Sequence, residues 1–204
     1  MQATIVIPTK RGREALAERA TQAALGQAWA GLVDVVLVAD AGSRLRGRPW
    51  VRQPAVQLVE INDSWRDGVR DKSIGAVPWM VGSLIAQGDL IGFCGDDDEL
   101  HPDHVHRHAE VLAESSVAFT ISPVRFCVGG VERFVIGDAS FAHGHLDADG
   151  IMCNRWALRT ANWTATGEDA ADWRLVQDWL RSGLVGQYIG GEPTATHNDG
   201  WAAR

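Results

Sequence analysis

The sequence predicts an α/β protein in which helices flank a mostly parallel sheet and residues 1–204 form a single domain. Three observations favour this class. Short β-branched runs alternate with segments of helical apolar spacing through residues 1–115, which is typical of parallel sheets with right-handed crossovers. The chain has 204 residues, 46% of them hydrophobic and 22% charged, which is enough for a core of its own. No internal repeat, low-complexity segment or interdomain linker interrupts it.

Four strands and three helices are expected in the first half of the chain. Strands are predicted where β-branched apolar runs are bounded by turn residues, at 3–8, 32–40, 55–61 and 89–94. Helices are predicted at 12–27, at 70–88 with an interruption at Pro78, and at 101–115 with Pro102 in the first turn. This regular alternation is what predicts the parallel sheet.

The second half has a different pattern. Residues 116–138 are expected to form strands with a hairpin at Gly129-Gly130, and residues 139–150 a polar, glycine-rich loop. A helix is predicted at 168–183, with acidic residues at its start and Gly183 as its stop. The tail from residue 190 is predicted to be irregular.

Composition narrows the classes of protein. The net charge of -7 does not favour nonspecific electrostatic binding to nucleic acid. The N-terminus does not resemble a signal peptide, and no stretch approaches the ~20 apolar residues of a membrane span. The three widely spaced cysteines are interpreted as reduced core thiols. We therefore expect a cytoplasmic protein without a membrane segment.

The carboxyl ends of the expected strands carry the most informative residues. Ligands of parallel sheets bind beyond these ends, and the side chains expected to converge there are Pro8, Thr9, Asp40 and the acidic run 96–98. In "GDLIGFCGDDDELHPD" an apolar strand leads through Gly95 into three aspartates. Mg²⁺ prefers one or two carboxylates and keeps positions for water and phosphate. The placement favours a metal site over a solvated acidic loop.

Four segments in order resemble a known family. They are "IVIPTKRGREALAERATQAALGQ", "VDVVLVADAGS", "RDKSIG" and "GDLIGFCGDDDELHPDHVHRHAEVL". Together they resemble the nucleotide-binding half of the family 2 glycosyltransferases, which have a GT-A fold, and the similarity returns at "AADWRLVQDWLRSG". The resemblance implies a metal-dependent, inverting transfer of a sugar from a nucleoside-diphosphate sugar, expected to be a UDP-sugar, to an acceptor hydroxyl. Residues 1–115 would bind the donor and residues 116–204 the acceptor.

The resemblance also implies roles for single residues on the donor side. Pro8 and Thr9 end the strand that holds the nucleobase in the family. Asp40 matches the acid that binds the base or ribose, although Ala41 is an extra residue in that motif. Lys72 matches a basic residue near the base, which is usually arginine.

The metal-binding signature of the family, Asp-x-Asp, falls on Gly95-Asp96-Asp97. Gly95 stands where the first acid is usual, so Asp96 is expected to take over that role in donor binding. Asp97 is the ligand expected first for Mn²⁺ or Mg²⁺, with Asp98 beside it. His197 matches a late histidine that serves as a third metal ligand in many GT-A enzymes, and a surface-loop histidine is the alternative.

On the acceptor side, Asp172 matches the catalytic base. A carboxylate there would take the proton of the attacking hydroxyl. Ala171 replaces a glutamate that often precedes this base, and an ordinary helix N-cap is the alternative role for Asp172. The neighbouring Trp173 could stack on a sugar or pack in the core. His143 and His145 lie in the loop expected to face the acceptor, with plain exposure slightly favoured.

Two further clusters are interpreted first as solvent-exposed groups without a functional role. His101, His104, His106 and His108 resemble a metal cluster, but without a zinc motif around them a solvated helix face is favoured. The arginines at 44, 46, 48 and 52 are interpreted first as a solvated loop; a diphosphate clamp and a contact for a polyanionic acceptor are the alternatives. The acceptor could be a glycan, a small molecule or a hydroxylated base in modified nucleic acid.

Two competing functions stay open at the level of sequence. Nucleotidyl transfer, which makes nucleotide sugars, would need a glycine-rich loop after the first strand, and "PTKRGRE" has a single glycine. A non-catalytic nucleotide-sugar-binding domain is motivated by Gly95 and Ala171, which replace acids of the family pattern.

Overall fold

The computed structural model describes residues 1–40, 43–61, 76–163 and 171–199. The strands are β1 (Gln2–Thr9), β2 (Leu32–Asp40), β3 (Val56–Ile61), β4 (Leu90–Phe93), β5 (Glu99–Leu100), β6 (Phe119–Ile121), β7 (Val124–Val128), β8 (Val131–Ile136), β9 (Ile151–Asn154), β10 (Gly186–Tyr188) and β11 (Ala195–Asp199). The α-helices are α1 (Glu14–Leu25), α2 (Ala76–Ile85), α3 (His104–Leu112), α4 (Ala157–Thr160) and α5 (Ala171–Arg181), and η1 (Pro49–Arg52) and η3 (Ala148–Gly150) are 3₁₀ turns.

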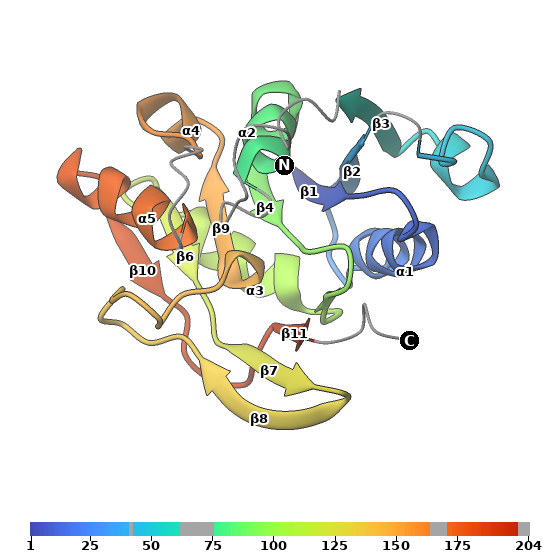
Figure 1. The fold of residues 1–204 in the computed structure, drawn as a ribbon. Coiled ribbons are helices and arrows are strands. Elements are labelled where there is room, and N and C mark those ends of the chain that lie inside the picture. Colours follow the sequence, from blue (N-terminus) through green and yellow to red (C-terminus); the bar gives the residue numbers. More distant parts are fainter. Residues whose placement is uncertain (41–42, 62–75, 164–170, 200–204) are drawn as a thin grey trace.

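The larger sheet has seven strands in the order β10-β6-β9-β4-β1-β2-β3 (Figure 1). β1 lies parallel to both β2 and β4, and β2 is parallel to β3, as expected for crossover connections. β9 runs antiparallel between β4 and β6. The sequence predicted neither β9 nor β10. The mostly parallel α/β architecture is confirmed.

Helices cover both faces of this sheet, and the alternation of side chains along β1 shows how. Ile5 and Ile7 point into a cluster with apolar residues of α1 and α3. Val6 points the opposite way, into a cluster with residues of α2, α4 and α5. Successive side chains of a strand face opposite sides, and residues 3–7 of β1 are all buried, so this strand is buried on both faces.

A smaller sheet has the order β5-β11-β7-β8. β7 and β8 form the hairpin expected at Gly129-Gly130, and both glycines have positive φ, at 58° and 80°. The prediction of an irregular tail is wrong, because residues 195–199 form β11, antiparallel to β5 and parallel to β7. In Figure 1 this sheet lies beyond the ends of β4 and β6.

Helix α3 corrects a second prediction. His104 and His108 were expected on a solvated face, but both are fully buried, while His106 lies on the outside. They share a face with Val105, Ala109 and Leu112, which packs on the sheet. Hydroxyl groups from distant segments supply partners for the imidazoles and make this burial tolerable.

Cys94, Cys127 and Cys153 are buried and free, as core thiols should be. The interruption predicted at Pro78 is wrong, because α2 runs through it from Ala76 to Ile85, and residues 70–75 of the predicted helix lie outside the described residues. Among the described residues, every helix is too short or too polar to span a bilayer.

Candidate functional site

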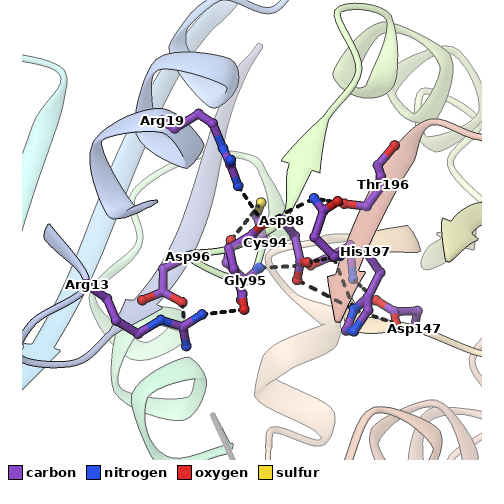
Figure 2. Close-up of polar contacts among 12 residues, drawn as sticks. Arg13, Arg19, Cys94, Gly95, Asp96, Asp98, Asp147, Thr196 and His197 are labelled. Atoms are coloured by element: carbon purple, nitrogen blue, oxygen red, sulfur yellow. Dashed lines mark hydrogen bonds and ion pairs between the residues drawn. The ribbon is translucent and has the colours of Figure 1, made fainter. Parts of the chain in front are cut away.

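Two groups of side chains meet beyond the carboxyl ends of β1 and β4 (Figure 2). In the first, the Thr9 hydroxyl donates to Asp96 Oδ2 at 2.7 Å, which confirms that these two strand ends converge. Arg13, just before α1, pairs with both Asp96, at 3.1 Å, and Asp97. Arg19 Nη2 donates to the backbone carbonyl of Asp97 at 2.7 Å. A protein cation therefore already neutralises part of the acidic run.

Three expected donor residues can be placed only in part. Pro8 lies within β1, opposite Val38 of β2. Asp40 is the last residue of β2, but its side chain lies outside the described residues, as does all of Lys72.

The second group consists of Asp98, Asp149 and His197, and we call it the Asp-Asp-His cluster. One ligand atom from each lies within 4.8 Å of the others. His197 Nδ1 is 3.6 Å from Asp98 Oδ2, 3.9 Å from Asp149 Oδ2 and 3.2 Å from Asp147 Oδ2. The loop after β4, the turn η3 and the strand β11 each contribute one residue. Figure 2 shows Asp98 facing His197, with Arg13 and Asp96 on the other side.

Backbone donors fix the two carboxylates of the cluster. Asn198 N–H donates to Asp98 Oδ1 at 2.7 Å, and Gly95 N–H donates to Asp149 Oδ1 at 2.8 Å. A methyl group added at Gly95 would collide with the carboxylate of Asp98. A side chain at the position where the family pattern has its first aspartate would therefore displace the Asp98 carboxylate from its present place.

Aromatic stacking holds the ring of His197. His197, Phe126 and Phe134 are opposite one another on β11, β7 and β8. The ring centroids of His197 and Phe126 are 4.8 Å apart with planes 9° from parallel, and Phe126 and Phe134 are spaced equally at 7°. This column fixes the plane of the imidazole.

Burial disfavours the charged forms of the carboxylates in the cluster. Burial raises the pKa of Asp98 to about 6 and that of Asp149 well above its ordinary range. Burial opposes the charge of His197, but the hydrogen bond to Asp147 and the charges of Asp147 and Asp98 raise its pKa to about 9. Clustered buried carboxylates therefore face one partly exposed cation.

The cluster fits a divalent cation. Asp149 is 1% exposed, and among the described residues its Oδ2 has no hydrogen-bond partner. A buried carboxylate oxygen without a partner is costly unless something else neutralises it. Two carboxylates and an imidazole are suitable donors for Mn²⁺, whereas Mg²⁺ prefers oxygen alone.

Asp172 lies in the first turn of α5, beside Trp173, whose N–H donates to Asp172 Oδ1 at 2.7 Å. Burial and the charge of Asp147 raise the pKa of Asp172 to about 6, while His197 lowers it. Asp172 is therefore within electrostatic reach of the cluster. The ring centroids of His143 and Trp173 are 5.4 Å apart with planes at 81°, so the loop after β8 contacts the helix that carries Asp172.

Sequence reasoning missed Asp147, Asp149 and Arg13. A signal for the first two was available, because "LDADG" places an Asp-x-Asp directly before β9. Arg13 carries no such signal, since an arginine before a helix is commonplace.

Comparisons with known proteins identify the fold. No family model and no curated protein matches the sequence. S. aureus TarS 1-349 in complex with UDP-GlcNAc superposes with a TM-score of 0.73 at 14% identity, covering 98% of this chain and 59% of that one. The mannosyltransferase PcManGT from Pyrobaculum calidifontis, in complex with GDP-Man and Mn²⁺, gives 0.68 at 14% identity, covering 96% and 56%. The chain thus spans less than two thirds of either length, and the expected GT-A fold is confirmed.

Proposed function

We propose that the protein is a metal-dependent, inverting glycosyltransferase that moves a sugar from a nucleoside-diphosphate sugar to an acceptor hydroxyl. The observation that carries the proposal is the Asp-Asp-His cluster at the carboxyl ends of the strands, on a fold shared with two solved nucleotide-sugar complexes. Ligands of open α/β sheets bind at such strand ends.

On the donor side, Asp98, Asp149 and His197 would hold Mn²⁺ or Mg²⁺. A bound divalent cation would offset the negative charge that builds up on the departing diphosphate. Thr9 and Asp96, together with Pro8, Asp40 and Lys72, would contact the nucleoside. Asp97, the ligand expected first from the sequence, is paired with Arg13, so we assign the ion to Asp98 rather than to Asp97.

On the acceptor side, Asp172 would act as the base. Its carboxylate would accept the hydroxyl proton while the acceptor oxygen attacks the anomeric carbon and the bond to the diphosphate breaks on the opposite face. One displacement of this kind inverts the anomeric configuration. A pKa of about 6 leaves the carboxylate mostly ionised at neutral pH and able to take that proton.

The test combines binding with turnover. Thermal shifts would be measured with UDP-GlcNAc, UDP-glucose and GDP-mannose, each with and without Mn²⁺. A donor at a hundredfold excess over its dissociation constant should stabilise the protein by about 2.7 kcal/mol. The effect should require Mn²⁺.

Asp172→Asn should keep this stabilisation by the donor. It should no longer release the nucleoside diphosphate, whether water or an acceptor hydroxyl attacks the sugar. Asp178→Asn is the matched control, because Asp178 lies on the same helix but pairs with Arg181 at the exposed surface. Full turnover by Asp172→Asn would remove the base assignment. Absence of any Mn²⁺-dependent donor binding would oppose the function itself.

A further inference from the structure

We propose that a buried chain of imidazole and hydroxyl groups positions the two segments that carry Asp149 and His197. Its members are His104, Thr194, Ser122, His108 and Thr120, and we call it the imidazole–hydroxyl chain. The inference rests on the proposed function in one respect only, because that function makes Asp149 and His197 metal ligands.

Contacts between neighbours make the chain continuous. His104 Nδ1 is 2.9 Å from Thr194 Oγ1, which is 2.5 Å from Ser122 Oγ. Ser122 Oγ is 3.1 Å from His108 Nε2, and His108 Nδ1 is 2.7 Å from Thr120 Oγ1. Four of the five residues have no exposed surface and Ser122 has 1%, so water does not compete for these bonds.

One arrangement of protons satisfies every link. The Thr120 hydroxyl donates to the Met152 carbonyl at 3.3 Å, so its oxygen accepts from His108 Nδ1–H. His108 Nε2 then accepts from the Ser122 hydroxyl at 3.1 Å, the shorter of that hydroxyl's two possible donations, since the Gly150 carbonyl lies at 3.4 Å. Ser122 in turn accepts from Thr194, and Thr194 accepts from His104 Nδ1–H. In this arrangement both imidazoles carry their proton on Nδ1, and burial, which lowers the pKa of each, favours the neutral form.

The hydroxyl members of the chain lie next to the ligand-bearing segments. Ser122 N–H donates to the carbonyl of Gly150, the residue after Asp149, at 2.9 Å. Gly150 has room for no side chain, because an added methyl would lie 2.6 Å from the Ser122 carbonyl oxygen. Thr194 immediately precedes β11, three residues before His197. The Ser122–Thr194 contact therefore joins the η3 segment directly to the start of β11.

Hydrogen bonds define this junction more sharply than apolar contacts would. Side chains of a strand alternate between faces, so a slip of one residue in β11 would turn His197 away from Asp98 and Asp149. Two apolar surfaces can shift along each other at little cost. A buried hydroxyl that is hydrogen-bonded to two partners keeps both bonds in only one position. Fixing Thr194 thus fixes the register of β11 and the face that His197 occupies.

The experiment compares Thr194→Val with Thr4→Val. Thr4 is equally buried and accepts from Gly88 N–H at 2.8 Å, but among the described residues it makes no hydrogen bond to a member of the chain or the cluster. Both substitutions remove one buried hydroxyl without changing volume much, so both should lower the melting temperature. Thr194→Ser keeps the hydroxyl and serves as the rescue.

Two readouts separate positioning from general stability. Mn²⁺ alone is titrated and free ion is followed by electron paramagnetic resonance; loss of a supporting partner costs roughly 10–100-fold in metal affinity. We expect about a tenfold loss for Thr194→Val, none for Thr4→Val and recovery for Thr194→Ser. Amide hydrogen exchange in 149–152 and 195–199 should rise in Thr194→Val alone.

Each outcome decides something. Equal Mn²⁺ affinity and equal local exchange in the two valine variants would overturn the positioning role. If the wild-type protein binds no Mn²⁺, the proposed metal site fails, and the exchange measurement still tests whether the chain holds η3 and β11 together. Faster exchange in both segments for Thr194→Val alone would support the chain even then.

Discussion

Replacing Asp98 by asparagine should stabilise the metal-free protein while it removes the effect of metal. Burial raises the pKa of Asp98 to about 6, from an ordinary value of 3.8. A folded-state pKa above the unfolded value means that the folded protein binds more protons between these two values, so stability is lost as pH rises through 6. Each unit corresponds to about 1.36 kcal/mol, so the ionised carboxylate costs about 2 to 3 kcal/mol at pH 8.

Asparagine removes that charge and keeps the oxygen that accepts from Asn198 N–H. For a chain of this length each kcal/mol shifts the melting temperature by about 2–4 °C, so Asp98→Asn should melt roughly 4–12 °C higher at pH 8 without metal. The gain should vanish near pH 4, where Asp98 of the wild-type protein is protonated. Mn²⁺ should raise the melting temperature of the wild type and leave that of the variant unchanged.

The assay is a melting curve at several pH values with and without Mn²⁺. The difference between variant and wild type reports on Asp98 together with Asp149 and His197, whose pKa values its charge raises. Asp97→Asn is the control, because the Asp97 carboxylate is a quarter exposed and is paired with Arg13. A metal-free Asp98→Asn that melts below the wild type at pH 8 would refute the electrostatic reasoning. Loss of the Mn²⁺ shift in Asp97→Asn but not in Asp98→Asn would restore Asp97 as the ligand.

Three further outcomes are expected. The rate of transfer should rise with pH and level off above about 6, because Asp172 must be ionised to act as a base; a rate independent of pH between 5 and 7 would contradict that role. Acid should destabilise the protein through His104 and His108, since burial lowers the pKa of His104 to about 3 and that of His108 well below its ordinary value. The unfolded chain then binds protons below about pH 6.5 that the folded chain does not, so stability falls as pH falls. His108→Gln should reduce the dependence of the unfolding free energy on pH by the contribution of about one proton. The measurement is urea unfolding at pH 4 to 7, and an unchanged slope of unfolding free energy against pH would count against this role. Gly95→Ala should keep the fold and weaken Mn²⁺ binding at least tenfold by calorimetry, since the added methyl displaces the Asp98 carboxylate; wild-type affinity would show that the carboxylate can move without consequence.

The sequence predicted those parts of the fold whose signal is local. β1, β2 and β4 are dominated by apolar residues because both faces of the sheet are covered, and such runs are visible without a structure. The acidic run after β4 is conspicuous for the same reason, since it follows a buried strand directly. His197 was identified by resemblance, and the structure brings it to the acids.

What the sequence did not predict depends on contacts between distant segments. "ATHND" has the polarity of a loop, and it becomes β11 because β5 and β7 offer it two open edges. His104 and His108 look solvated beside their charged neighbours, but hydroxyls from positions 120, 122 and 194 satisfy them in the interior. Asp149 lies in a glycine-rich loop, and only the folded chain shows that its carboxylate turns inward.

The late position of β11 has a consequence for the order of events during synthesis. All seven strands of the larger sheet precede residue 195, so a nascent chain can assemble that sheet before β11 has been made. β5 and β7 lie on either side of β11 and do not pair with each other, so the smaller sheet closes only when β11 is inserted. An interrupted chain would therefore keep its main scaffold and lack His197. Under the proposed function, binding of the ion would therefore depend on a strand that is made only after the whole larger sheet.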